Sequence, residues 1–101
     1  MDTLQALRTR RSVRHYQDKP VPKELLAEIV DCARLAATAR NTQPWEFVVV
    51  TEKADLQRLA AMVDYGRHIA PAGACVAVFC RDTTYYVEDG SAATQNLLVA
   101  A

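Results

Sequence analysis

Only two stretches of this chain have the character of β-strands, and helical stretches surround them. Both are short apolar runs, which is typical of buried strands; residues 46–50 are rich in valine, and the second run is residues 74–80. Apolar residues at helical spacing mark residues 3–9, residues 23–39, a stretch after Thr51, and residues from about 85 onward. The order helix, helix, strand, helix, strand, helix predicts an α+β or α/β fold with a small sheet.

The helix boundaries follow from capping residues. Asp2 is placed to cap the first helix, Pro22 suits the start of the second, and Thr51 is placed to cap the third. The apolar stripe of the second helix is expected to face the core; its members are Leu25, Leu26, Ile29, Val30, Ala33, Ala36 and Ala37.

The last helix has no stop signal before Ala101. One apolar face is predicted for it, made of Val87, Ser91, Thr94, Leu98 and Ala101, with Leu97 beside it. Gly90, Ala92 and Ala93 keep this helix thin, so another helix could approach closely. Because a sheet usually needs more than two strands, we expect the chain to be part of a larger fold. The remainder would be missing here or supplied by another polypeptide.

Composition excludes several classes of protein. The 101 residues suit one small domain or part of one, and 12 basic residues balance 12 acidic ones. Zero net charge argues against a general nucleic-acid or anionic-membrane binder. No apolar run is long enough to span a bilayer, and the N-terminus lacks the pattern of a signal peptide. We therefore expect a cytoplasmic location.

The three cysteines are interpreted as buried free thiols in a reducing compartment. Cys32, Cys75 and Cys80 each lie among apolar residues, their number is odd, and no Cys-x-x-Cys pair occurs. Neither histidine has ligand spacing with them, so no metal site is predicted.

A basic cluster, residues 10–14, follows the first helix. It contains Arg10, Arg11, Ser12 and Arg14. Planar guanidinium groups bind phosphate esters through parallel charge-assisted hydrogen bonds, so the cluster indicates a phosphate site. On its own, a solvated surface cluster is the simpler interpretation, since short basic runs are common.

An amide-rich turn, residues 41–45, lies beyond the second helix. Asn41 and Gln43 both donate and accept hydrogen bonds, which suits the mixed polar edge of a pyrimidine-like ring. Taken alone, Asn41 would more simply cap the helix end, and Gln43 would lie in a turn. Trp45 is expected in the core.

Other chemistries lack support in the sequence. There is no Gly-x-Gly-x-x-Gly or Walker loop and no Ser-His-Asp or Cys-His set. His15 is expected in an exposed loop. Tyr85, Tyr86 and Asp89 are interpreted as structural, with substrate contact as the minor alternative.

Three segments taken in order resemble the nitroreductase family of flavoproteins. The first is the basic cluster, Arg10-Arg11-Ser12-Val13-Arg14. The second runs from Ala36 to Val49 and includes Asn41-Thr42-Gln43-Pro44-Trp45. The third runs from Asp89 to Ala101. The family often has Pro-Ser or Ser-Ser where this chain has Ala37-Thr38-Ala39, although Thr38 keeps a hydroxyl.

The resemblance implies an α+β, three-layer fold with a mixed or antiparallel sheet flanked by helices. It also implies an obligate intertwined homodimer with FMN at the subunit interface. Residues 1–101 would be the N-terminal part of a single FMN-binding domain, because the family's later strands and its second flavin-contacting loop have no counterpart here. The helix from about Tyr85 would be the long central helix of the dimer.

By the same resemblance, Arg10, Arg11, Ser12 and Arg14 would hold the FMN phosphate and ribityl chain. Asn41 and Gln43 would lie near the isoalloxazine, and Thr38 would be a further cofactor-binding residue. The implied activity is NAD(P)H-dependent, ping-pong reduction of nitroaromatics, quinones or other electron-poor acceptors. A flavin-binding or interaction module without turnover, and a fragment completed by a second polypeptide, remain alternatives.

Overall fold

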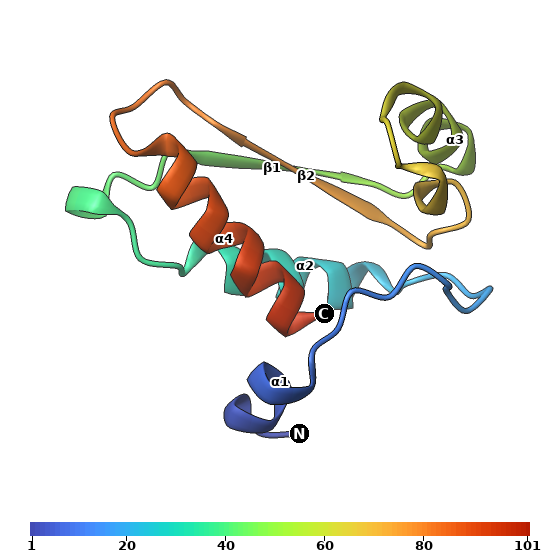
Figure 1. Ribbon diagram of the computed structural model, residues 1–101, viewed down its shortest axis with the longest axis horizontal. Helices are drawn as coiled ribbons and strands as arrows, with labels where there is room; N and C mark the ends of the chain where they lie inside the picture. The colour runs from blue at the N-terminus through green and yellow to red at the C-terminus, as the bar shows by residue number, and fades with distance from the viewer.

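The computed structural model describes residues 1–101 and shows two strands among four α-helices (Figure 1). In chain order the elements are α1 (Thr3–Thr9), α2 (Lys23–Arg34), the 3-10 turn η1 (Ala39–Asn41), β1 (Trp45–Val50), α3 (Lys53–Met62), the 3-10 turn η2 (Arg67–Ile69), β2 (Cys75–Cys80) and α4 (Tyr86–Ala100). This order confirms the predicted succession of helices and strands. None of the helices is both long and apolar enough to cross a membrane.

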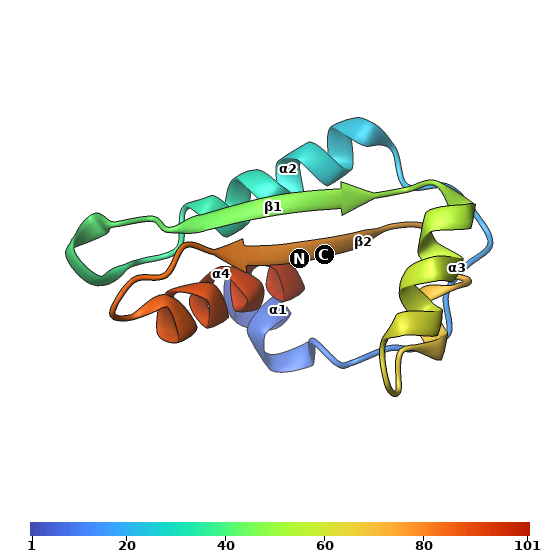
Figure 2. The same cartoon turned by 90° about the horizontal axis from the view of Figure 1, so that it is seen from above.

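The sheet is an antiparallel pair covered on one face. Trp45 lies opposite Cys80 at one end of the ladder, and Val50 lies opposite Cys75 at the other. α2 and α4 lie on the same side of this sheet, and α3 lies near the end of β1 (Figures 1 and 2). On the opposite face, the side chains of Val48 and Phe79 are exposed. The single covered face confirms an α+β arrangement.

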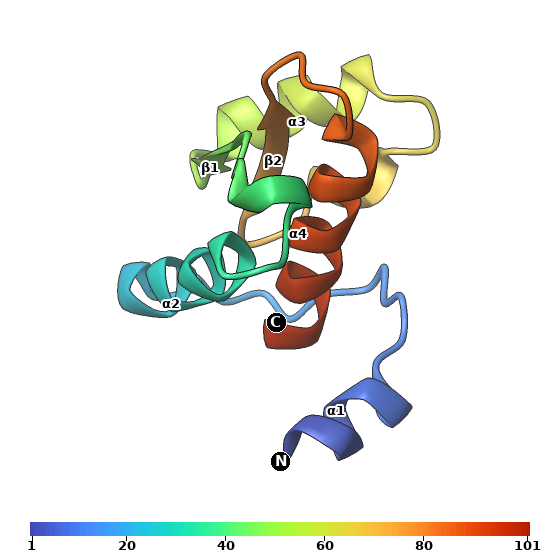
Figure 3. The ribbon, with the colours of Figure 1, turned by 90° about the vertical axis from the view of Figure 1, so that its left-hand side faces the viewer.

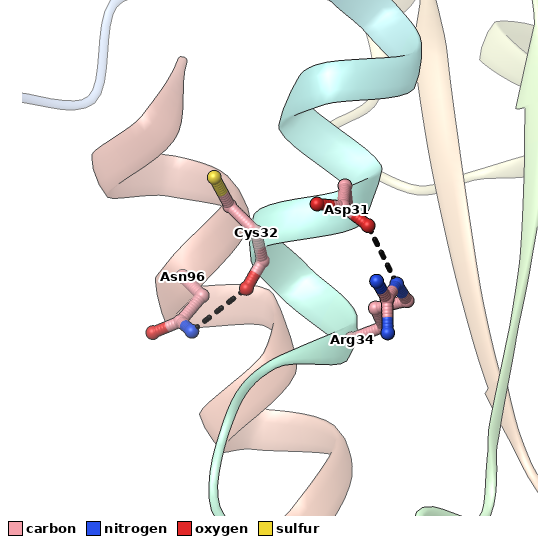
Figure 4. A network of polar contacts seen from close by, with 4 residues as sticks. All are labelled: Asp31, Cys32, Arg34 and Asn96. Carbon is pink, nitrogen blue, oxygen red and sulfur yellow. Dashed lines mark hydrogen bonds and ion pairs between the residues drawn. The ribbon is translucent and has the colours of Figure 1, made fainter.

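Small side chains allow α2 and α4 to approach closely. Ala33 on α2 and Ala93 on α4 are both 0% exposed, and Leu26 and Leu97 are buried on the same two helices. The side-chain amide of Asn96 donates a hydrogen bond to the carbonyl of Cys32 at 3.0 Å, so a polar contact joins the two helices (Figure 4). Trp45 is buried as predicted.

α1 matches its predicted bounds, and Asp2 caps it by accepting the Gln5 N–H at 2.8 Å. The helix buries none of its residues and lies apart from the rest of the chain (Figure 3). The segment that follows it, residues 11–20, is exposed throughout, including His15 as expected.

The second helix was predicted too long. α2 ends at Arg34, whereas the helical spacing continues to Ala39. Its last turn tightens, because the N–H groups of Leu35 and Ala36 bond carbonyls three residues back. Beyond it, Thr38 is extended and the chain reverses toward β1. Alanines carry helical periodicity but supply too little apolar surface to hold the helix against this reversal.

Two further predictions from the sequence are wrong, the cap of α3 and the burial of the thiols. Thr51 does not cap α3; Glu52 occupies the cap position, without a side-chain hydrogen bond. Cys32 is exposed, and Cys75 and Cys80 are only partly buried. The prediction that all three thiols are buried is therefore wrong. Cys32 differs because α2 contacts α4 through Ala33 and the Cys32 carbonyl, which leaves the thiol at the surface.

The predicted apolar face of α4 is not the face that packs within this chain. Val87 is 57% exposed and Leu98 is 48% exposed, and Ser91 and Thr94 are exposed as well. The buried residues are instead Asp89, Ala93 and Leu97. A helix with alanine, leucine and valine on several sides has more than one apolar face, so periodicity alone could not select the buried one.

Candidate functional site

The turn between α2 and β1 is held in an unusual backbone conformation. We call residues 38–43 the amide loop. Arg40, Asn41 and Gln43 have φ angles of 55°, 55° and 50°. Non-glycine residues in this left-handed region cost about 1–3 kcal/mol each and persist where surrounding structure enforces them. Asn41 tolerates the conformation best, because a short amide can bond locally. Asn41 thus shapes this turn and does not cap α2.

Inside the amide loop, side chains and backbone bond to one another. The Gln43 side-chain amide donates to Asn41 Oδ1 at 2.8 Å, and the Gln43 N–H donates to Thr38 Oγ1 at 3.2 Å. Thr42 Oγ1 donates to the Ala39 carbonyl at 2.8 Å. Asn41 keeps its NH₂ group, and Gln43 keeps its carbonyl oxygen, for other partners. Both side chains are exposed, so the paired amides present a donor and an acceptor together.

Two distant residues, Asp89 and Arg81, attach the amide loop to the rest of the fold. The buried carboxylate of Asp89, on the first turns of α4, accepts the Ala39 N–H at 3.2 Å. The Arg81 guanidinium donates to the Thr42 carbonyl at 3.5 Å, and the Arg81 N–H donates to the Pro44 carbonyl at 2.9 Å. The loop is therefore fixed relative to both α4 and the end of β2.

Two adjoining depressions lie where the amide loop meets the start of α4. One, of about 340 Å³, is lined by Ala37, Thr38, Ala39, Tyr85, Glu88 and Asp89. The other, of about 300 Å³, is lined by Ala39, Arg40, Thr42, Thr83, Thr84, Tyr85 and Asp89. The hydroxyl of Thr83 is buried and has no hydrogen-bond partner. An orphaned hydroxyl beside a depression is a group that a bound molecule could satisfy.

α4 passes close behind the end of β2 at this site. A Cβ on Gly90 would lie 3.0 Å from Cys80 Sγ, so the glycine leaves room for this thiol beside α4. Burial raises the pKa of the Cys80 thiol, and the nearby charge of Asp89 raises it further, while Arg81 acts in the opposite direction. Cys80 is therefore a protonated packing residue at neutral pH, not a nucleophile.

The basic cluster is arranged differently. One guanidinium nitrogen of Arg11 donates to the carbonyls of Arg8 at 3.1 Å and Arg10 at 2.7 Å, so Arg11 closes the C-terminus of α1. The side chains of Arg10, Ser12 and Arg14 make no hydrogen bond or ion pair in this chain. Two arginines and a hydroxyl thus remain available for an anion, and Arg11 contributes mainly to local structure.

The structure does not bring the two predicted sets together. The amide loop lies at one end of the molecule, beyond the start of β1, whereas the chain after α1 runs away toward the opposite end (Figures 1 and 2). Within one copy of residues 1–101, the basic cluster and the paired amides therefore do not face a common cavity.

Several residues at the site were missed or undervalued by sequence reasoning. Arg81, Thr83 and Tyr85 line or support the depressions, and only Tyr85 had been considered, as a minor alternative. The sequence interpretation of Asp89 as structural did not indicate its partner, the Ala39 N–H of the amide loop. An acidic residue among the apolar residues of α4 was the available signal, since a buried charge needs a partner.

Comparison with known proteins identifies the family. The sequence model of the nitroreductase family matches residues 7–96. A relative from Methanothermobacter thermautotrophicus, with the provisional name NADH dehydrogenase/NAD(P)H nitroreductase, is 38% identical over all of this chain and 56% of its own length. The chain therefore spans little more than half of that relative.

Solved structures agree with the sequence match. A protein of the same provisional name from Bacteroides thetaiotaomicron superposes with a TM-score of 0.94 at 35% identity, over 98% of this chain and 60% of that one. A nitroreductase, so named provisionally, from Desulfovibrio desulfuricans in complex with FMN gives 0.86 at 33% identity, over 98% and 61%. Together with the match over residues 7–96, these similarities show that the chain belongs to the nitroreductase family.

Proposed function

We propose that residues 1–101 form the N-terminal part of a single FMN-binding domain of an NAD(P)H-dependent oxidoreductase. The amide loop is the observation that carries this proposal. It holds Asn41 and Gln43 in a strained, paired arrangement that presents one donor and one acceptor. A flavin ring has a mixed donor and acceptor edge that such a pair fits. The FMN complex of the Desulfovibrio desulfuricans relative supports the choice of cofactor.

The chemistry of the remaining side chains also fits FMN. Arg10 and Arg14 have unpaired guanidiniums, and Ser12 has a free hydroxyl, which suits a phosphate at the end of a ribityl chain. Arg11 would contribute by fixing the backbone of the cluster. Thr38 would act through its hydroxyl, which already holds the Gln43 N–H, so its role is to shape the loop.

When bound, FMN supplies the hydride and electron transfer between NAD(P)H and an electron-poor acceptor such as a nitroaromatic or a quinone. The residues of this chain would bind the phosphate, orient the ring and leave one face open for the two substrates in turn. That order of binding corresponds to a ping-pong mechanism. No side chain of the chain is assigned an acid or base role.

A second subunit would bring further residues to the site. The basic cluster and the amide loop do not meet within one copy, while α1 buries none of its residues and one apolar face of α4 is exposed. We therefore propose a homodimer in which FMN lies between residues of both subunits. The three free thiols fit a cytoplasmic enzyme.

Flavin titration and reduction test the proposal. We expect FMN added to the purified protein to gain the altered visible absorbance of a bound flavin. Anaerobic NADH or NADPH should bleach that absorbance, and a nitroaromatic or a benzoquinone should restore it. Binding without bleaching would favour the alternative of a flavin-binding module without turnover. A protein that binds no FMN contradicts both, and the intact mass, together with whether a second polypeptide co-purifies, then tests the alternative of a fragment completed by another chain.

A further inference from the structure

Asp89 is the buried charged residue of this chain, and its partner is a backbone group far away in sequence. The residue is 5% exposed and lies in the first turns of α4. Its Oδ1 accepts the N–H of Ala39, which lies 50 positions earlier, at 3.2 Å. Orphan N–H groups at the start of a helix favour a negative charge there, so α4 stabilises the carboxylate in place.

The amide loop depends on contacts from outside itself. Its internal bonds, such as Gln43 to Asn41 and Gln43 to Thr38, move with the loop and cannot orient it against the fold. The Arg81 contact to Thr42 is 3.5 Å long, which is at the limit for a hydrogen bond. Each contact has one charged side chain, and the Asp89 contact, at 3.2 Å, is the shorter of the two side-chain attachments.

We infer that Asp89 is a positioning residue for the flavin ring. Its carboxylate holds the Ala39 N–H and keeps Asn41 and Gln43 in the left-handed conformation in which they would meet the ring. Asp89 itself bonds the loop backbone and touches no reacting atom. The inference rests on the proposed function, because it assigns the amide loop to the flavin.

The first part of the test needs no flavin. Amide hydrogen exchange is measured on the whole protein for Ala39, Asn41, Thr42 and Gln43, and for β1 and β2 as internal reference. Asp89→Ala should accelerate exchange in the amide loop about tenfold, equivalent to about 1.4 kcal/mol, with the strands unchanged. Asp89→Asn keeps a carbonyl acceptor and should accelerate it less, by about threefold. If Asp89→Ala fails to fold, the exchange rates of Asp89→Asn test the inference in its place.

The second part of the test distinguishes an effect on binding of the flavin ring from an effect on binding of the phosphate. FMN and riboflavin share the ring and the ribityl chain, and only FMN has the phosphate. Asp89→Ala should lower the affinity for both flavins by the same factor, about tenfold. In Asp89→Asn the loss of affinity should be smaller. The matched control is Asp82→Ala, which removes an exposed carboxylate seven residues away and should change neither exchange nor binding.

The outcomes distinguish the inference from the proposed function. Unchanged exchange in the amide loop, or equal acceleration in β1 and β2, would overturn the positioning role. Loss of FMN binding with normal riboflavin binding would overturn it too, since the effect would then lie at the phosphate. If the parent protein binds neither flavin while Asp89→Ala still opens the loop, the proposed function fails, and with it the flavin role of Asp89.

Discussion

The amide loop and the basic cluster are both exposed and polar, yet the fold holds them in opposite ways. The amide loop has its own hydrogen bonds, a strained backbone and attachments to α4 and β2. The basic cluster follows a helix that buries nothing, and only Arg11 among its side chains makes a bond, to carbonyls of α1 and of the residue that ends it. The amide loop is therefore preorganised by the fold, while the basic cluster would gain its contacts only from a ligand or a second copy.

Removing positive charge from the basic cluster should lower the affinity for FMN and leave the free energy of unfolding nearly unchanged. The double variant Arg10→Ala, Arg14→Ala should bind FMN about 100-fold more weakly or worse, because each charged hydrogen bond contributes about 1.5–3 kcal/mol. The free energy of unfolding should change by less than about 0.5 kcal/mol, since neither side chain has a partner in the fold. Titration with FMN and chemical denaturation measure the two quantities.

Arg58→Ala is the matched control for this double variant. Arg58 is an exposed arginine on α3 with one loose contact to Asp55 at 3.4 Å. FMN affinity should not change in this variant. Parent-like affinity in the Arg10 and Arg14 double variant would remove the phosphate assignment, and a large loss of stability would show that the cluster is part of the fold after all.

In the amide loop, backbone and side-chain roles separate at Asn41. Asn41→Ala should lower the free energy of unfolding by about 1 kcal/mol, because alanine is strained at a φ of 55°. Asn41→Gly keeps that conformation at no steric cost, so its stability should stay close to that of the parent. Both variants lose the amide, and both should bind FMN about tenfold more weakly. A glycine variant that binds like the parent would leave Asn41 with a backbone role only.

The smallest expected effect concerns the thiols of Cys32 and Cys80. Cys32 is exposed, whereas burial and the charge of Asp89 raise the pKa of Cys80. At pH 8 a thiol reagent should therefore modify Cys32 several-fold faster than Cys80, and Asp89→Asn should speed the reaction of Cys80. Mass spectrometry of the labelled protein over time measures both rates.

The raised pKa of Cys80 also predicts how the free energy of unfolding depends on pH. The folded state favours the neutral thiol, so the stabilising contribution of Cys80 is present below the ordinary pKa of a thiol in the unfolded chain. It is lost as the pH rises through the higher folded value. Cys80→Ala should remove this part of the pH dependence. Equal labelling of Cys32 and Cys80 would show that α4 does not close over β2 in solution.

Local signals in the sequence predicted most of the fold. Asp2, Pro22 and the valine run after Glu46 mark the element boundaries to within a residue or two. The failures occur where the deciding contact is distant. Ala36 to Ala39 continue a helical pattern, but the chain reverses there, and Asp89 accepts the Ala39 N–H from across the fold.

The candidate site divides in the same way. Residue chemistry suggested binding roles for Arg10, Arg14, Asn41 and Gln43, and the family resemblance favoured those roles over the simpler structural ones. The bond between the two amides needs the left-handed backbone at both positions, and no composition rule gives that conformation to glutamine before proline. Which face of α4 packs inward was equally hidden, because alanine and leucine occupy more than one side of that helix.

The bond between Asp89 and Ala39 joins a side chain to a main-chain N–H, and this has a consequence for how the two positions tolerate sequence change. Every residue except proline has that N–H, so position 39 can change identity and keep the link. Position 89 has no such freedom, because only a short side chain with an acceptor oxygen serves there. Among variants selected for binding, substitutions should therefore accumulate at residue 39 and be rejected at residue 89.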